Sequence, residues 1–172
     1  MMDFFAYFEL SFQQWDVIAD SYIPVLALLS AIHLALYFLQ GTQFCKGFIF
    51  EYLKHSLLRL ACIILCLIWV YGLMFLDHAL NIWPSFNYNG HILDYSTHTA
   101  LAWVFSSYLF FAYQKHFKWI AGLIVMSMAL YLGLMKYQNY HTVADMLTTS
   151  LVVLPPMALL LKSVFSSPHL TL

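Results

Sequence analysis

Apolar residues run along most of the chain in long stretches, and short segments between them carry most of the charged residues. A helix needs about 20 such residues to cross the hydrocarbon core of a bilayer, with a range of about 17–25. The pattern predicts five transmembrane helices, the first opening near Pro24 and the last kinked by Pro155 and Pro156. Their predicted spans are 22–40, 57–76, 98–114, 119–137 and 142–162.

Two further segments, 3–19 and 42–55, combine aromatic residues with charges. Such segments are typical of helices or collars that lie in the membrane interface, with aromatic rings at the level of the lipid headgroups. We therefore expect interfacial helices beside the spans.

Composition sharpens this picture by excluding other classes. Of 172 residues, 63% are hydrophobic and 9% are charged, whereas soluble domains carry about 25% charged residues. This excludes a soluble domain and intrinsic disorder. A net charge of −1 leaves no basic surface for nucleic acid, and three cysteines imply no disulfide framework. We expect a single all-α integral membrane domain over residues 1–172, built as a compact bundle of about five helices.

Charge predicts the orientation of this bundle. One face of the predicted topology collects all but one of the basic residues, namely Lys46, Lys54, Arg59, Lys115, Lys118 and Lys162, against Glu51. The other face collects Asp3, Glu9, Asp16, Asp20, Asp77, Asp94 and Asp145 against Lys136. Since basic residues in short loops stay cytoplasmic, the N-terminus should lie outside, in a periplasm or organelle lumen, and the C-terminus in the cytoplasm.

Three ionisable residues on the outward face are candidate catalytic residues. His98 opens the third span and His141 opens the fifth, and Asp145 follows His141 by four residues. Residues four apart on a helix share a face, so Asp145 would hold the His141 imidazole in one tautomer and raise its basicity. Ionisable groups at membrane depth are costly and are functional candidates by default.

The openings of the third and fifth spans also predict an anion site. Both helix N-termini would point outward with free N–H groups and the positive end of the helix dipole, which suits a phosphate. Ser96, Thr97, Thr99 and Thr142 would add hydroxyl groups. The residues assigned to substrate binding are Ser96, Thr97, Thr99, Lys136, Asn139 and Asp94.

These motifs resemble the phosphatidic acid phosphatase type 2 superfamily, especially its sphingomyelin synthase-like branch. The segment 94–100 (DYSTHTA) resembles the Ser-Gly-His-Thr signature, with Thr97 in place of Gly, and 140–146 (YHTVADM) resembles the His-x-x-x-Asp signature. The resemblance covers roughly residues 85–160. The usual Lys/Arg motif is missing, and Met135 stands where an Arg is usual. The sphingomyelin synthase-like branch also tends to lack that Arg.

The resemblance implies a covalent mechanism on a phospholipid or lipid phosphate. His141 would attack phosphorus, Asp145 would orient it, and His98 would protonate the departing alcohol. Water or another alcohol would then release the phosphohistidine, with no cofactor required.

Two other classes stay open. A metal-dependent membrane hydrolase would use zinc or another divalent metal, which would supply the missing positive charge. The third class is a non-catalytic protein that binds lipid headgroups or serves as a scaffold, in a homo-oligomer or a larger membrane assembly. The residues offered as metal ligands in the second class are Asp77, His78, His91, His98, His141 and Asp145.

Overall fold

The chain forms an all-α bundle in a computed structural model that describes residues 10–44, 49–88 and 90–166. Its helices are α2 (Phe12–Phe44), α3 (Ile49–Leu80), α4 (Thr97–Tyr113), α5 (Lys118–Tyr137) and α6 (Val143–Phe165). Among the described residues, α2, α3, α5 and α6 are long and apolar enough to cross a membrane. The protein is an integral membrane protein, and the predicted fold class is confirmed.

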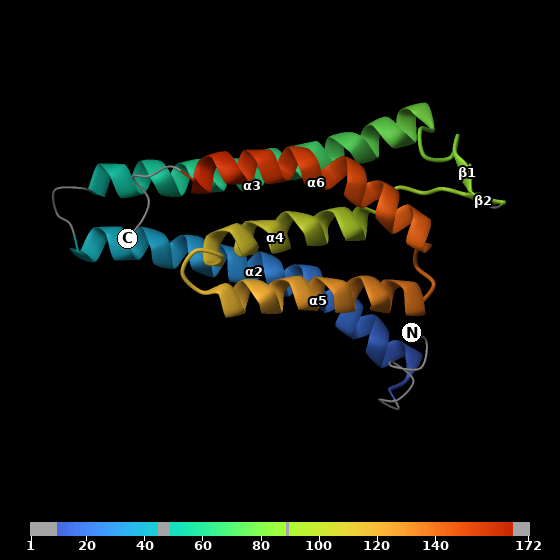
Figure 1. Cartoon of the computed structure of the whole chain (residues 1–172), viewed down its shortest axis with the longest axis horizontal. Coiled ribbons are helices and arrows are strands. Elements are labelled where there is room, and N and C mark those ends of the chain that lie inside the picture. The colour runs from blue at the N-terminus through green and yellow to red at the C-terminus, as the bar shows by residue number, and fades with distance from the viewer. Residues whose placement is uncertain (1–9, 45–48, 89, 167–172) are drawn as a thin grey trace.

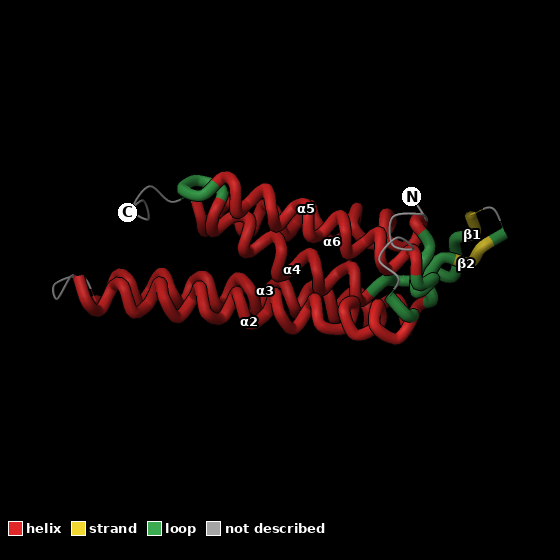
Figure 2. The backbone as a smooth tube through the Cα atoms, turned by 90° about the horizontal axis from the view of Figure 1, so that it is seen from below, coloured by secondary structure: helices red, strands yellow, loops and turns green. Residues whose placement is uncertain are grey.

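Successive helices run antiparallel along the long axis of the molecule (Figure 1). The α2–α3 hairpin forms one layer, and α4, α5 and α6 all lie on the same side of this layer (Figure 2). The shortest of the five, α4, occupies the centre and contacts all the others. Because α4 and α6 both begin at the end of the bundle that carries the hairpin of β1 (Asn87–Tyr88) and β2 (His91–Ile92) (Figure 1), their N-termini meet there.

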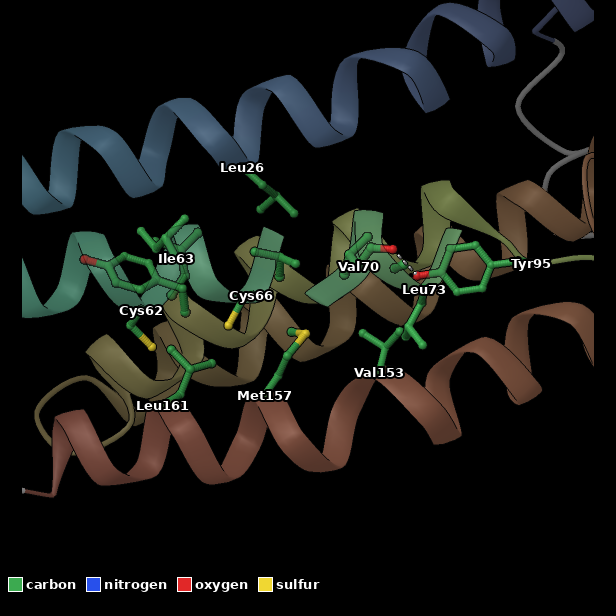
Figure 3. Packing of buried hydrophobic residues seen from close by; sticks show 14 of the residues in the cluster. Leu26, Cys62, Ile63, Cys66, Val70, Leu73, Tyr95, Val153, Met157 and Leu161 are labelled. Atoms are coloured by element: carbon green, nitrogen blue, oxygen red, sulfur yellow. Dashed lines mark hydrogen bonds between the residues drawn. The ribbon is translucent and has the colours of Figure 1, made fainter. Parts of the chain in front are cut away.

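The core lies where α3, α4 and α6 pack together. Cys62, Cys66 and Val70 of α3 face Met157 and Leu161 of α6, as Figure 3 shows. Both thiols are free and buried, and at these positions cysteine behaves as a small hydrophobic residue. Most large apolar side chains of α2 and α3 point outward instead, which suits helices surrounded by lipid.

The first helix begins at Phe12, well before the start of the predicted span 22–40. Ser11 and Gln14 form a reciprocal capping box, in which the Ser11 N–H donates to Gln14 Oε1 at 2.8 Å and the Gln14 N–H donates to Ser11 Oγ at 3.3 Å. This cap starts α2 at Phe12, so Pro24 lies inside the helix and not in its opening turn.

The described parts of both predicted interfacial segments belong to long helices. Residues 12–19 are the first turns of α2, and residues 42–44 and 49–55 belong to α2 and α3. Residues 3–9 and 45–48 lie outside the described residues. Charges at 16, 20, 51 and 54 suggested separate segments, but a charge on one face of a helix end does not interrupt the helix.

The remaining helices lie over the predicted spans, and short polar segments end them. Asn81, with φ 49°, ends α3, and Asn139, with φ 58°, ends α5. Asparagine adopts this left-handed conformation more readily than most residues. The helix α6 continues through Pro155 and Pro156 and bends along its length (Figure 1). After Asn81, a small hairpin pairs β1 (Asn87–Tyr88) with β2 (His91–Ile92).

Candidate functional site

An open pocket of about 340 Å³ lies at the end of the bundle where α4 and α6 begin. It collects polar residues from three parts of the chain: the end of α3, the start of α4 and the residue before the N-cap of α6. Its lining residues are Met74, Asp77, His78, Asp94, Tyr95, Thr97, His98 and His141. The predicted convergence of positions 98 and 141 on one pocket is therefore found in the structure.

The two imidazoles face one another at a distance that one small group can bridge. The ring centroids of His98 and His141 are 6.5 Å apart. His98 is exposed and His141 is half-buried. Burial lowers the pKa of His141 below its ordinary value, and the carboxylates of Asp94 and Asp145 oppose this shift only in part. His141 is therefore neutral at neutral pH, as a nucleophile must be.

Tyr140 is a neighbour of this pair that the motifs did not indicate. Its ring stacks beside that of His98 with a centroid distance of 6.3 Å. Its hydroxyl donates to Asp16 of α2, and this hydrogen bond raises the pKa of Tyr140 to about 12. The contact fixes the loop before His141 against α2.

Asp145 does not lie on one helix face with His141 as predicted, although its charge raises the pKa of His141 as the sequence suggested. Helix α6 begins at Val143, so His141 lies before the helix and does not share a helix face with Asp145. Asp145 Oδ2 accepts hydrogen bonds from the Thr142 N–H and hydroxyl at 2.8 and 2.7 Å, and Oδ1 accepts from the Asp94 N–H at 2.9 Å. The carboxylate closes a capping box and ties the loop before α4 to α6. It acts on His141 through its charge.

The hydroxyl groups at the start of α4 are also used within the fold. Ser96 Oγ caps the helix by accepting from the Thr99 N–H and donates to Thr99 Oγ1 at 2.7 Å. The Ser96 N–H donates to Thr149 Oγ1 of α6 at 3.0 Å. Ser96, Thr99 and Thr149 are fully buried, so they position the start of α4. Among the predicted hydroxyl groups of α4, Thr97 lines the pocket.

The caps also change the predicted anion cradle. The N–H groups of Thr99 and Asp145 donate to the cap residues Ser96 and Thr142. By its place in the first turn, the N–H of His98 lacks an acceptor within the helix. Fewer free N–H groups are therefore available to an anion than two uncapped helix ends would offer.

The loop between α3 and α4 is pinned over the bundle by buried aromatic residues. Asp77 Oδ1 accepts from the Trp83 N–H at 2.7 Å, and the Trp83 indole donates to Thr148 Oγ1 at 3.1 Å. The Tyr95 hydroxyl donates to the Val70 carbonyl at 3.1 Å (Figure 3). Burial raises the pKa of Tyr95. The run Thr148, Thr149 and Ser150, unusual inside an apolar helix, was the sequence signal for these contacts.

Besides the buried Ser96, Thr99 and Asp145, three further predicted residues lie outside the pocket lining. Lys136 is exposed on the last turn of α5, and Asn139 serves as the left-handed residue that ends this helix. His91 is exposed in β2 and pairs with Tyr88 across the hairpin. Assigning these residues to the site from their side of the membrane alone placed them too close to it.

The predicted metal ligands are divided by the fold. Asp77, His78, His98 and His141 line the pocket, whereas His91 lies in the hairpin and Asp145 is held by its capping bonds. Over the part of the chain that the structure describes, no three His, Cys, Asp or Glu side chains are grouped closely enough to hold a metal ion. The zinc hypothesis stays a prediction.

Comparison with protein-family models, curated proteins and solved structures finds no match for this chain. The resemblance to the phosphatase superfamily therefore rests on the two motifs and stays a prediction.

Proposed function

We propose that this pocket is the active site of a membrane lipid phosphatase or headgroup phosphotransferase that acts through a phosphohistidine. One observation carries the proposal: two imidazoles that are 43 residues apart in sequence face one pocket with their centroids 6.5 Å apart. A phosphoryl group between them would be within reach of a nucleophile on one side and a proton donor on the other.

The proposed reaction has two steps. A neutral nitrogen of His141 attacks phosphorus, the bond from phosphorus to the alcohol oxygen breaks, and protonated His98 gives its proton to that oxygen. Water or a second alcohol then attacks the phosphohistidine and loses a proton to His98, and the phosphorus–nitrogen bond breaks. Each histidine ends the cycle in its starting state, so the pair needs no external proton store.

The environments of the two histidines support this division of roles. Burial keeps His141 neutral, whereas the side chain of His98 is exposed to solvent. Two titratable groups in different surroundings are what acid–base assignment requires. The first-turn N–H of His98, at the positive end of the α4 dipole, would stabilise the negative charge that develops on the phosphoryl group.

A second candidate is a metal-dependent hydrolase, which one observation favours. Asp77 and Asp94 share the pocket with three histidines, and two carboxylates repel a phosphate anion unless a positive charge offsets them. A bound divalent metal would supply that charge and polarise a phosphoryl or acyl oxygen. Chelation separates the two candidates, because only the metal enzyme loses activity with the metal.

The pocket should face the outside of the membrane. Among the described residues, its end of the bundle carries Asp16, Asp20, Asp77, Asp94 and Asp145 with one basic residue, Lys136, and the opposite end carries Lys54, Arg59, Lys115, Lys118 and Lys162 with one acidic residue, Glu51. By the positive-inside rule the basic end is cytoplasmic. In a Cys45→Ser background, a membrane-impermeant thiol reagent should label Ser85→Cys and not His116→Cys in intact cells. Labelling of only His116→Cys would show that the orientation is opposite to the one proposed.

A substrate panel tests the function. The purified protein is assayed on phospholipids, lipid phosphates and prenyl pyrophosphates, with and without a chelator, beside His98→Ala and His141→Ala. Release or transfer of phosphate that survives chelation and requires both histidines supports the proposal. Activity that chelation abolishes supports the metal enzyme. Lipid binding without turnover on any substrate supports a non-catalytic protein and contradicts both enzyme proposals.

A further inference from the structure

The opposite end of the bundle holds a buried arginine without a carboxylate partner. Arg59 of α3 is only 6% exposed. Its guanidinium carbon lies 3.6 Å from the ring centroid of Tyr37 and 4.7 Å from that of Phe165. Across the described residues, no Asp or Glu lies within 4.0 Å of it, since the ion pairs found there involve Lys54 and His55.

The aromatic rings satisfy only part of what this cation needs. Cation–π contact stabilises a desolvated guanidinium, but a ring face does not accept hydrogen bonds from its five N–H groups in the way that an oxygen atom does. Arg59 Nε is buried and has no hydrogen-bond partner among the residues that the structure describes. Burying an unpaired charge is strongly unfavourable, and an oxygen-rich anion would be a suitable partner for it.

Arg59 borders a pocket that could hold such an anion. The pocket has a volume of about 310 Å³, and its lining includes Arg59, Lys115, His33 and His116; none of the described residues that line it is acidic. The Lys115 ammonium donates to the Phe165 carbonyl at 2.9 Å, which leaves two of its three protons for a ligand. The remaining walls are largely aromatic and aliphatic, from α2, α4 and α6. The pocket thus combines positive charge with an apolar wall.

The depth of the pocket matches the headgroup level of a bilayer. From Arg59 to the end of α3 at Leu80 is 21 residues, or about 32 Å at 1.5 Å per residue. The hydrocarbon core is about 30 Å thick. With the histidine pocket at one membrane boundary, Arg59 therefore lies at the other, level with the end of α4. The first turns of α3 extend beyond it (Figure 1).

We propose that the Arg59 pocket binds a phosphate group, carried by an anionic lipid of the leaflet at the basic end or present as free phosphate. Arg59 would form charge-assisted hydrogen bonds to two phosphate oxygens and Lys115 would contact a third. The site is separate from the histidine pocket and does not depend on the function proposed for it.

The full-length protein, purified in non-ionic detergent, is titrated by calorimetry with dihexanoyl phosphatidylglycerol and, in a second arm, with inorganic phosphate. We expect saturable binding that Arg59→Gln weakens by at least about tenfold and that Lys115→Gln weakens less. Lys162→Gln removes an exposed charge from the same end of the bundle and should leave the affinity unchanged. Binding in the lipid arm alone identifies the headgroup, and equal binding in both arms identifies phosphate itself.

A His98→Ala/His141→Ala variant separates the two pockets, since it should retain the Arg59-dependent binding. If Arg59→Gln does not fold, Arg59→Lys and Lys115→Gln carry the same comparison. Equal affinity of wild type and the folded Arg59 and Lys115 variants would overturn the proposal. So would the absence of saturable binding in both arms, or a loss of binding confined to the histidine variant.

Discussion

Two sets of buried polar residues, one near each end of the bundle, differ in how their hydrogen bonds are satisfied. At the end with the histidine pair, Asp145 and Ser96 are buried within closed sets of hydrogen bonds that join α4 to α6. At the other end, Arg59 is equally buried, but its Nε contacts no acceptor among the described residues. A fully satisfied hydrogen-bond network fixes the positions of the side chains around it, as a catalytic site requires. A buried charge without a hydrogen-bond acceptor favours the binding of a ligand of opposite charge. This difference is consistent with the two proposals, turnover at the histidine pocket and anion binding at the Arg59 pocket.

The largest effect should come from the proposed nucleophile. We expect His141→Ala to lower turnover of a lipid phosphate by more than about 10³-fold, because no covalent intermediate can form. His91→Ala is the matched control, since His91 is exposed in β2 outside the pocket, and it should stay near wild type. Equal losses in the two variants would remove the distinction between the pocket and its surroundings.

The proposed acid should have a smaller effect that depends on the leaving group. His98→Ala should lower turnover of an alkyl phosphate ester by about 10²-fold or more. With a nitrophenyl ester the loss should shrink to below about tenfold, because a good leaving group departs without a proton. Steady-state rates on the two esters give the comparison. The same loss on both would mean that His98 only shapes the pocket.

The closed network makes a prediction about stability. Asp145→Asn keeps the size of the side chain but removes its charge and replaces one of the two carboxylate oxygens that accept hydrogen bonds from Asp94 and Thr142. It should lower the free energy of unfolding by about 2 kcal/mol and lower the melting temperature measured in detergent. Asp20→Asn, at an exposed position of α2, is the control and should change little. A variant at Asp145 as stable as the control would contradict the structural role.

Those predictions rest on features that the sequence revealed unevenly. The matched depth of His98 and His141 at two span openings was enough to predict their convergence. The partner of Asp145 was not predictable, because the Asp94 N–H belongs to a loop whose path depends on Trp83 and its contact with Thr148.

The fold shows the same division. The apolar runs predicted the bundle and placed the later spans within a few residues of α4, α5 and α6. The start of α2 depends on the Ser11–Gln14 cap, which hydropathy does not reveal. Arg59 was taken for a basic residue at the cytoplasmic end of its span. Its burial between Tyr37 and Phe165 arises from helices distant in sequence.

The smallest effect is a shift in pH dependence. Burial lowers the pKa of His141 below the ordinary value of about 6.5, so the nucleophile stays neutral as the pH falls through that value. The acidic limb of the rate profile should therefore have its midpoint below pH 6.5. A pH series of kcat/KM measures this limb. A midpoint above 6.5 would mean that a protonated carboxylate or another histidine limits the reaction.

Trapping of the covalent intermediate tests the central claim most directly. The protein is mixed with a substrate carrying labelled phosphorus, quenched in alkali, where phosphohistidine is stable, and digested for mass spectrometry. We predict acid-labile phosphate on His141, absent from His141→Ala and unchanged in His91→Ala. Turnover with no label on His141, and at the same rate in His141→Ala, would contradict the account.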